Sequence, residues 1–354
     1  METPLTLTDV EALAVARMDP DWSEYLAGGA GLERTLAENI AAFASWRLRQ
    51  RVLCGIDSVS TATTVLGQRL DSPVVVAPVA YQALAHVDGE EGMARAAAAV
   101  GSAICLSTFS NASTAQVAEA APDAVRFLQV YVFRDHGVTD ELIAQALEAG
   151  FSAIFLTVDL PVVGARDRER RIHWTFSDEA LPAVRYAVER GVIGPGSLGM
   201  LDPALDWAYL ERLVSSVPVP VVVKGVLEPE DAVLAAEHGA AGIVVSNHGG
   251  RQLDGATPSL EALPDIVDAV GDRLEVLFDG GIRRGTDVAT ALALGAQAVL
   301  AGRVPLWGLG AGGEGGARAV LELLREELAI ALHLTGCRSV TELSAEHVAH
   351  AVRP

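Results

Sequence analysis

Residues 246–255, Ser-Asn-His-Gly-Gly-Arg-Gln-Leu-Asp-Gly, place a titratable base and a permanent cation close together in the chain. Histidine is the side chain whose unperturbed pKa lies nearest neutrality, so His248 could take a proton from a substrate. Arginine stays charged and presents a planar fork that fits a carboxylate, so Arg251 could hold an acid group. A histidine taken at random is more often a packed or surface residue. The two types at this spacing nevertheless predict a reaction site.

The residues before this segment indicate where it lies. Residues 241–245 are apolar and rich in β-branched side chains, as expected of a strand that is buried on both faces. The polar cluster begins where that strand must end, so we expect His248 at the carboxyl tip of a strand. Two glycines between His248 and Arg251 allow the backbone to approach a ligand closely.

Four segments repeat a pattern in which a helix ends at glycine and a strand follows a few residues later, at Gly101, Gly150, Gly239 and Gly295. Glycine is favoured just past a helix end, so each segment predicts a helix-to-strand junction. The predicted helices include 89–100, 139–149 and 229–238. The eight predicted strands lie near 74–79, 103–108, 127–132, 153–159, 219–224, 242–247, 275–279 and 298–302. Eight such units predict an α/β fold, a (β/α)8 TIM barrel, whose reactions occur at the carboxyl ends of the strands.

We expect one domain over residues 1–354, because α/β barrels of this length are common. Residues 1–70 carry helical periodicity and predict an N-terminal helical cap. The long interval between the fourth and fifth strands predicts an insertion after strand four. Its residues 166–205 mix charge, aromatic side chains, glycine and proline, which is typical of a lid over the site rather than a second core.

Composition excludes several classes of function. A formal net charge of −20 argues against nucleic acid or an anionic membrane as the partner. Cys54, Cys105 and Cys337 match no metal or redox spacing, so we expect no metal and reduced thiols. The chain has neither an apolar signal core at its start nor an uncharged stretch of the ~18 residues that a membrane helix needs, so we expect a cytoplasmic protein.

Two further groups of polar residues end predicted strands. Lys224 follows three valines, and burying its charge would be costly unless the charge is paired or faces an electron-rich ligand. Asp279-Gly280-Gly281 and Gly302-Arg303 end the last two strands, where barrels commonly bind phosphate through backbone N–H groups and arginine. The alternatives are an ordinary ion pair for the lysine, and tight turns with solvated arginines for the other two segments.

Eight separate blocks of the sequence occur in the order found in one enzyme family. They are Tyr25 with Ala-Gly-Gly-Ala at 27–30, Ala-Pro at 77–78, Gln-Val-Tyr at 129–131, Thr-Val-Asp at 157–159, Val-Lys-Gly at 223–225, residues 246–255, Asp-Gly-Gly-Ile-Arg-Arg-Gly at 279–285, and Ala-Gly-Arg at 301–303. With these blocks the chain resembles, over nearly its whole length, the FMN-dependent α-hydroxy acid oxidases and dehydrogenases. That family includes glycolate oxidase, lactate oxidase, mandelate dehydrogenase and hydroxymandelate oxidase.

The resemblance implies FMN-dependent oxidation of an (S)-2-hydroxy acid to the 2-oxo acid, with His248 as the base. Asp159 would stabilise the imidazolium and Lys224 the reduced flavin. The implied catalytic residues are His248, Asp159, Lys224, Arg251 and Tyr131. The implied substrate-binding residues are Tyr25, Tyr131, Arg166, Arg251 and Phe109. The implied FMN-binding residues are Ala77, Pro78, Val79, Ala80, Ser107, Gln129, Thr157, Lys224, Ser246, Asp279, Gly280, Gly281, Arg283, Gly302 and Arg303.

The sequence departs from the family pattern around the substrate. Val162 and Ala165 stand where many relatives carry arginine, Phe109 where some have tryptophan, and the lid is short. These changes predict a wider mouth that favours a longer or aromatic 2-hydroxy acid over glycolate.

Several questions stay open at this stage. An FMN barrel without net redox turnover, such as an isomerase, and a non-catalytic flavin-binding protein are alternatives, although neither needs the His248 and Arg251 arrangement. The Gly-rich segment 310–315 matches a dinucleotide pattern but lacks a following strand–helix–strand unit, so we discount it. The electron acceptor could be O2, a quinone or a carrier protein. The resemblance also implies a homo-oligomer, a tetramer or octamer.

Overall fold

A computed structural model describes residues 6–173 and 201–351, and its centre is a closed barrel of eight parallel strands. The strands are β4 (Val74–Val76), β5 (Ala103–Leu106), β6 (Val125–Val130), β7 (Ile154–Thr157), β8 (Val221–Val226), β9 (Gly242–Val245), β10 (Glu275–Asp279) and β11 (Ala298–Ala301). Their order around the barrel follows the chain, and β11 pairs with β4 to close it. The prediction of a (β/α)8 barrel is confirmed, with each strand close to its predicted position.

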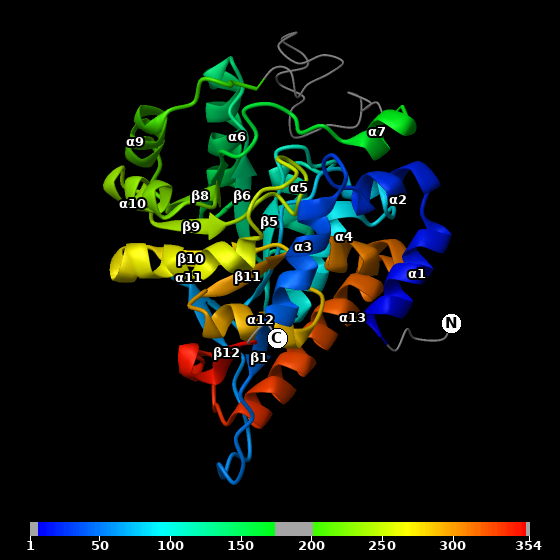
Figure 1. Cartoon of the computed structure of the whole chain (residues 1–354). Coiled ribbons are helices and arrows are strands. Elements are labelled where there is room, and N and C mark those ends of the chain that lie inside the picture. The colour runs from blue at the N-terminus through cyan, green and yellow to red at the C-terminus, as the bar shows by residue number, and fades with distance from the viewer. Residues whose placement is uncertain (1–5, 174–200, 352–354) are drawn as a thin grey trace.

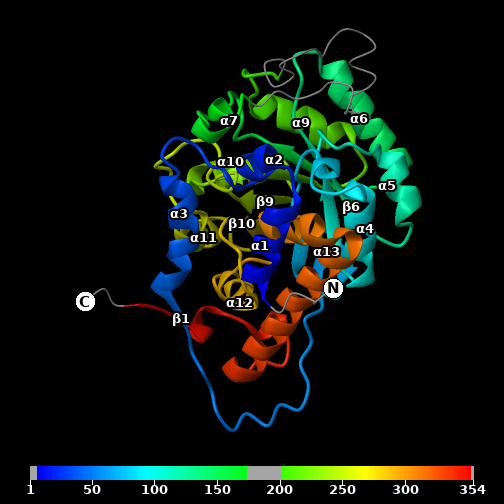
Figure 2. The ribbon, with the colours of Figure 1, turned by 90° about the vertical axis from the view of Figure 1, so that its right-hand side faces the viewer.

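A ring of helices surrounds the strands (Figures 1 and 2). The helices that follow the eight strands in turn are α4 (Gly89–Ala99), α5 (Thr114–Ala120), α6 (His136–Glu148), α9 (Trp207–Ser216), α10 (Pro229–Glu237), α11 (Ser259–Val270), α12 (Gly285–Ala293) and α13 (Arg303–Thr335). The Gly-rich segment 310–315 lies inside α13, where Gly312 and Gly313 leave helical geometry and kink the helix. It forms no strand-to-helix turn.

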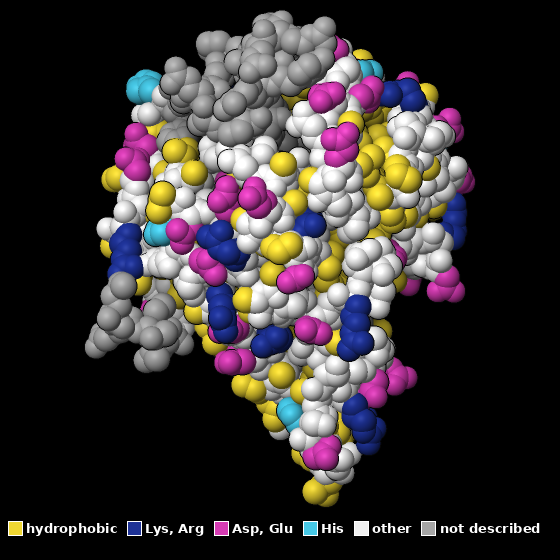
Figure 3. All heavy atoms as spheres, turned by 180° about the vertical axis from the view of Figure 1, so that it is seen from behind, with side chains coloured by type: hydrophobic (Ala, Val, Ile, Leu, Met, Phe, Trp, Pro, Cys, Tyr) yellow, Lys and Arg dark blue, Asp and Glu magenta, His cyan; other side chains and the backbone are white. Residues whose placement is uncertain are grey.

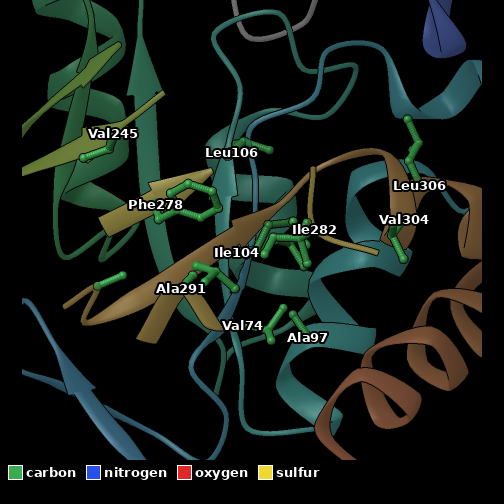
Figure 4. Close-up of a cluster of buried hydrophobic side chains, with 14 of the residues drawn as sticks. Val74, Ala97, Ile104, Leu106, Val245, Phe278, Ile282, Ala291, Val304 and Leu306 are labelled. Atoms are coloured by element: carbon green, nitrogen blue, oxygen red, sulfur yellow. The ribbon is translucent and has the colours of Figure 1, made fainter. Parts of the chain in front are cut away.

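Most side chains on both faces of the strands are apolar, because one face fills the barrel and the other packs on helices. Val75 points into the barrel, whereas Val74 and Val76 belong to the layer between strands and helices. In Figure 4, Val74 of β4 lies beside Ala97 of α4. Inside the barrel, the rings of Phe127 and Phe155 stack with centroids 5.3 Å apart.

Part of the predicted helical cap is not helical. Helices α1 (Leu7–Arg17), α2 (Pro20–Ala27) and α3 (Arg34–Ala41) are present, and α1 packs along α13. After a short 3-10 helix, η1 (Ala42–Ser45), β1 (Trp46–Leu48) pairs with β12 (Val348–His350), and β2 (Thr63–Val65) forms a hairpin with β3 (Gln68–Leu70).

The hairpin forms because it closes one end of the barrel. Val65 and Leu70 are fully buried in the cluster that fills the barrel interior. Leu66 and Gly67, between the two strands, both have positive φ, which is the geometry of tight hairpin turns. Helical periodicity over residues 1–70 was therefore a wrong expectation for residues 46–70.

The predicted lid begins with a short helix, α7 (Asp167–Arg171). Arg168 ties α7 to the N-terminal region through ion pairs with Glu24 and Glu33. Residues 174–200, most of the predicted lid, lie outside the described residues. In the part of the chain that the structure describes, no helix has both the length and the apolar character needed to cross a membrane.

The aromatic pair inside the barrel should contribute strongly to stability. We expect Phe155→Ala to lower the free energy of unfolding by ~3–5 kcal/mol, because it leaves a cavity in a closely packed interior. The matched control is Leu53→Ala, since Leu53 is fully exposed and its loss should change stability by less than ~0.5 kcal/mol. Guanidinium unfolding of both variants measures the difference, and equal effects would contradict a packed barrel interior.

Candidate active site

A cavity opens at the carboxyl ends of the strands, between the barrel and helices α2 and α3. It is lined by these residues singled out from the sequence: Tyr25, Ala77, Pro78, Val79, Ala80, Ser107, Phe109, Gln129, Tyr131, Thr157, Arg166, Lys224, His248, Arg251, Asp279, Gly280, Gly281, Arg283, Gly302 and Arg303. Asp159 and Ser246 do not line it but contact residues that do. The structure thus brings residues from the ends of all eight barrel strands and from the N-terminal region to one place.

His248 is held by contacts on both sides of its ring. Its Nδ1 lies 2.9 Å from Oδ1 of Asp159, and its Nε2 lies 3.4 Å from the hydroxyl of Tyr131. The backbone of His248 has a positive φ of 58°, and its N–H donates to Ser246 Oγ at 3.0 Å. A carboxylate at Nδ1 favours the tautomer with the proton on Nδ1, which leaves Nε2 free to accept a proton from the cavity.

Burial and charge act in opposite directions on this pair. Burial lowers the pKa of His248 below its ordinary value, although the negative charge of Asp159 opposes that shift. For Asp159, burial would raise the pKa, but the charge of His248, its hydrogen bond and the charge of Lys224 together lower it. Near neutral pH, His248 is therefore mainly a neutral base beside an ionised carboxylate.

Lys224 is buried and forms an ion pair, which was one of the two explanations that the sequence offered for its charge. Its Nζ lies 2.9 Å from Asp279 Oδ2 and donates to Ser246 Oγ at 3.0 Å. Burial opposes its charge, but Asp279 and Asp159 raise the pKa of Lys224 above its ordinary value. The lysine therefore keeps a positive charge at the cavity wall without any ligand.

Three cavity side chains carry buried polar atoms that have no hydrogen-bond partner among the described residues: Gln129 Nε2, Thr157 Oγ1 and Asp279 Oδ1. An unpaired buried donor or acceptor is costly, so such atoms point to a polar ligand. One donor, one hydroxyl and one carboxylate oxygen beside a lysine match a flavin ring edge and a ribityl chain. This fit is independent of any resemblance in sequence.

The glycines after β10 fit the phosphate end of such a ligand. Gly280 and Gly281 have positive φ, and a Cβ on Gly281 would lie 2.2 Å from the backbone oxygen of Asn39. Only glycine therefore allows α3 to pack so closely on this turn. The turn brings its backbone to the cavity beside the arginines at 283 and 303.

The two arginines at this end are already engaged. Arg283 pairs with Glu11 at 2.6 Å. Each side-chain nitrogen of Arg303 donates to a backbone carbonyl, of Leu26, Gly249 or Gly28, at 2.8–3.1 Å. Arg303 therefore contributes positive charge to the cavity and also fixes the end of α2.

Arg251 is fixed in a similar way and shares the carbonyl of Gly28 with Arg303. Its Nη1 donates to the carbonyls of Tyr25 and Gly28, both at 2.8 Å, and its guanidinium lies over the Tyr25 ring at 4.7 Å. Arg166 donates from Nε to the carbonyl of Arg251 at 3.0 Å and from Nη2 to Gln252 Oε1 at 3.3 Å. Both arginines pair with Glu169.

Sequence reasoning missed several residues of this region. Glu169 gave no usable signal, because a charged side chain in a short polar segment usually faces water. Gln252 stands inside the block at 246–255 but was given no role there. Tyr81 directly follows the block at 77–80 and could have been included with it. The remaining cavity-lining residues without a prior assignment are Leu26, Leu36, Asn39, Ile40, Leu160, Gly249, Ile282, Leu300 and Ala301.

Val162 and Ala165 lie outside the cavity, so the prediction that they widen its mouth is wrong. Val162 is 70% exposed, Ala165 is also exposed, and neither lines the cavity, so their small size does not widen it. The loop after β7 turns their side chains away. Phe109 does line the cavity, with its ring 5.4 Å from that of Tyr131 and 6.3 Å from that of Tyr81.

Comparisons with known proteins agree with this geometry. The family model described as FMN-dependent dehydrogenase matches residues 14–350. The chain belongs to this family. It is 44% identical to an L-lactate oxidase from Nostoc sp., with 97% of each chain covered, and 40% identical to glycolate oxidase from Spinacia oleracea, with 97% and 95% covered. Its fold matches a solved structure of mandelate oxidase with a TM-score of 0.90 at 40% identity, covering 98% of each chain.

As an FMN-dependent dehydrogenase, the protein uses FMN, and the unpaired cavity atoms described above suit that cofactor. The three compared relatives are named for the oxidation of lactate, glycolate and mandelate, all of which are 2-hydroxy acids. An FMN barrel without redox turnover is not favoured.

The contact between His248 and Asp159 yields a prediction about pH. In the native enzyme, kcat/KM should rise with pH through an apparent pKa below the ordinary histidine value of about 6.5, because burial disfavours the imidazolium. In Asp159→Asn this limb should move to still lower pH, since the charge that raises the pKa of His248 is gone. The plateau should also fall, by ~10²-fold, because the imidazolium is no longer stabilised.

Rates of anaerobic flavin reduction across pH 4–9 measure both changes. A limb that moves to higher pH, or an unchanged plateau, would show that Asp159 does not act on His248 in this way.

Proposed function

We propose that the protein oxidises an (S)-2-hydroxy acid to the corresponding 2-oxo acid and passes two electrons to FMN. One observation carries the proposal. Nε2 of His248, backed by Asp159, opens into the same cavity as Arg251 and the unpaired polar atoms that suit a flavin. A base, a carboxylate-binding cation and a redox cofactor in one cavity are the parts that this reaction needs.

When bound, FMN supplies the two-electron acceptor. Arg251 binds the substrate carboxylate through its guanidinium, and the phenol of Tyr25 packs against that guanidinium. His248 Nε2 then takes a proton from the substrate, and Asp159 stabilises the imidazolium that results. Burial raises the pKa of Tyr131, so its hydroxyl stays protonated and can donate a hydrogen bond to the substrate.

Other residues of the cavity would hold the cofactor. Lys224 would place positive charge beside the ring and so favour a reduced, electron-rich flavin. Gln129, Thr157 and Asp279 offer their unpaired atoms to the ring and ribityl chain. The glycine turn after β10, with the charges of Arg283 and Arg303, suits the phosphate.

We propose O2 as the electron acceptor, because the compared relatives are named oxidases.

A cytoplasmic location and a homo-oligomer are further parts of the proposal. Cys105 and Cys337 are buried free thiols, and the exposed Val52, Leu53 and Ile330 offer apolar surface that a second copy could cover. On the face in Figure 3, Lys and Arg side chains stand among Asp and Glu, and the net charge is −20, so nucleic acid is not the expected partner.

Anaerobic mixing of the FMN-loaded protein with glycolate, lactate, 2-hydroxyoctanoate and mandelate tests the function. We expect at least one acid to bleach the flavin, and an aromatic or longer side chain to be preferred, because Phe109 and Tyr131 line the cavity. His248→Gln should keep FMN but reduce it at least ~10²-fold more slowly. If no acid bleaches the native flavin, the proposal fails, and if the variant reacts normally, His248 is not the base.

The role of Arg251 has a separate test. Arg251→Lys keeps the charge but loses the planar fork and the contact with the Tyr25 ring, so we expect weaker substrate binding and slower reduction. The dependence of the reduction rate on substrate concentration separates the two effects. Unchanged values of both would mean that the carboxylate is held elsewhere, with Arg166 as the next candidate.

A further inference from the structure

A carboxylate bridges the two arginines of the cavity and has no part in the proposed reaction. Oε1 of Glu169 lies 2.9 Å from Arg251 Nη2 and 3.0 Å from Arg166 Nη1. All three side chains are largely buried, with 17%, 13% and 6% exposure respectively. We call Arg166 and Arg251 the arginine pair.

Glu169 approaches the arginine pair from α7. Both arginines line the cavity, whereas Glu169 does not. Its neighbour Arg168 points to a different set of partners, Glu24 and Glu33, and anchors α7 on the N-terminal region. Glu169 therefore adds negative charge behind the arginines without filling the space that a ligand would use.

The hydrogen bonds leave one edge of Arg251 for a ligand. Nη1 donates its two hydrogens to the backbone carbonyls of Tyr25 and Gly28, and Nη2 donates one hydrogen to Glu169. Nε has no acceptor among the described residues, so Nε and the second hydrogen of Nη2 can meet a carboxylate side by side. All three nitrogens of Arg166 already have acceptors. Arg166 therefore acts on a bound ligand mainly through its positive charge and less through direct hydrogen bonds.

Charge balance explains what Glu169 does there. Burial lowers the pKa of Arg251, and the charge of Arg166 lowers it further. Within the described residues, Glu169 is the one carboxylate that forms an ion pair with either arginine. The arginine pair and Glu169 together carry a single positive charge, which matches one carboxylate. Arg303, which shares the Gly28 carbonyl with Arg251, adds to the positive charge nearby. Without Glu169 the pair would hold two uncompensated buried charges and attract anions more strongly.

We propose that Glu169 is the built-in counter-ion of the arginine pair and sets how tightly the enzyme holds anionic ligands. The inference rests on the proposed function, in which Arg251 binds the substrate carboxylate. By weakening that binding, Glu169 lets the 2-oxo acid product leave and keeps simple anions from occupying the site.

The test is the affinity of the FMN-loaded protein for acetate, an unreactive monocarboxylate, measured by titration calorimetry. We expect Glu169→Gln to lower the Kd of acetate at least ~10-fold, because removing one negative charge strengthens attraction to the remaining cations. Acetamide, which has the same shape but no charge, should bind the variant as it binds the native protein. An unchanged or higher Kd for acetate would overturn the proposal.

Two variants control for structural effects. Glu169→Asp keeps the charge and should leave the Kd for acetate within ~3-fold of the native value. Arg168→Gln breaks the other ion pairs of α7 without touching the cavity and should not tighten acetate binding. If Arg168→Gln tightens it as much as Glu169→Gln does, movement of α7 and not charge is the cause, and the proposal falls.

A double variant covers the case in which Glu169→Gln alone does not fold. Arg166→Met with Glu169→Gln removes one charge of each sign, so its Kd for acetate should stay within ~3-fold of the native value. A Kd raised beyond that range would mean that Arg166 holds the anion directly, and the proposed role of Glu169 as counter-ion would be wrong.

Failure of this inference differs from failure of the proposed function. Flavin reduction by 2-hydroxy acids in the native protein tests the function alone, and acetate binding requires no turnover. If the native flavin is reduced but Glu169→Gln binds acetate no more tightly, only the role of Glu169 is lost.

Discussion

The charged groups at the carboxyl ends of the strands are withdrawn from water, and each must find its partner inside the protein. Lys224 pairs with Asp279, His248 with Asp159, and the arginine pair with Glu169. Arg303 instead donates hydrogen bonds to three backbone carbonyls. These pairings fix the loops after β7, β8, β9 and β10 relative to one another. The shape of the cavity is a consequence of them.

The apolar barrel makes this arrangement possible. Its interior is filled by side chains such as Phe127 and Phe155, and the β2–β3 hairpin closes its other end, so polar groups are confined to the carboxyl ends of the strands. Because the barrel is rigid, the strand ends hold His248 Nδ1 and Asp159 Oδ1 at 2.9 Å although the residues are far apart in sequence. A catalytic pair placed on strand ends loses little entropy when it acts.

The sequence predicted the residues at strand ends and missed the contacts between loops. His248, Lys224 and Asp279 could be placed because each follows a short apolar run whose end is visible in the sequence. Glu169 could not be placed, because it lies in a short, wholly charged helix. The sequence of such a helix looks the same whether its side chains face water or contact two buried arginines. The sequence also could not show where the side chains of Val162 and Ala165 point, because the alternation of side chains between two faces holds only within a strand. The β2–β3 hairpin was missed because three-residue strands are too short to show a period.

The N-terminal region is better understood as part of the active site than as a cover for it. The carbonyl of Gly28 accepts hydrogen bonds from both Arg251 and Arg303, each at 2.8 Å. One backbone oxygen after α2 therefore connects the arginine proposed to bind the substrate with the arginine proposed to serve the phosphate. The same segment positions Tyr25, whose ring lies against Arg251. Since carbonyl oxygens come from the backbone, this connection depends on the path of α2 more than on side-chain identity. A change that moves α2 would disturb both arginines at once, even where it alters no residue that touches substrate or cofactor.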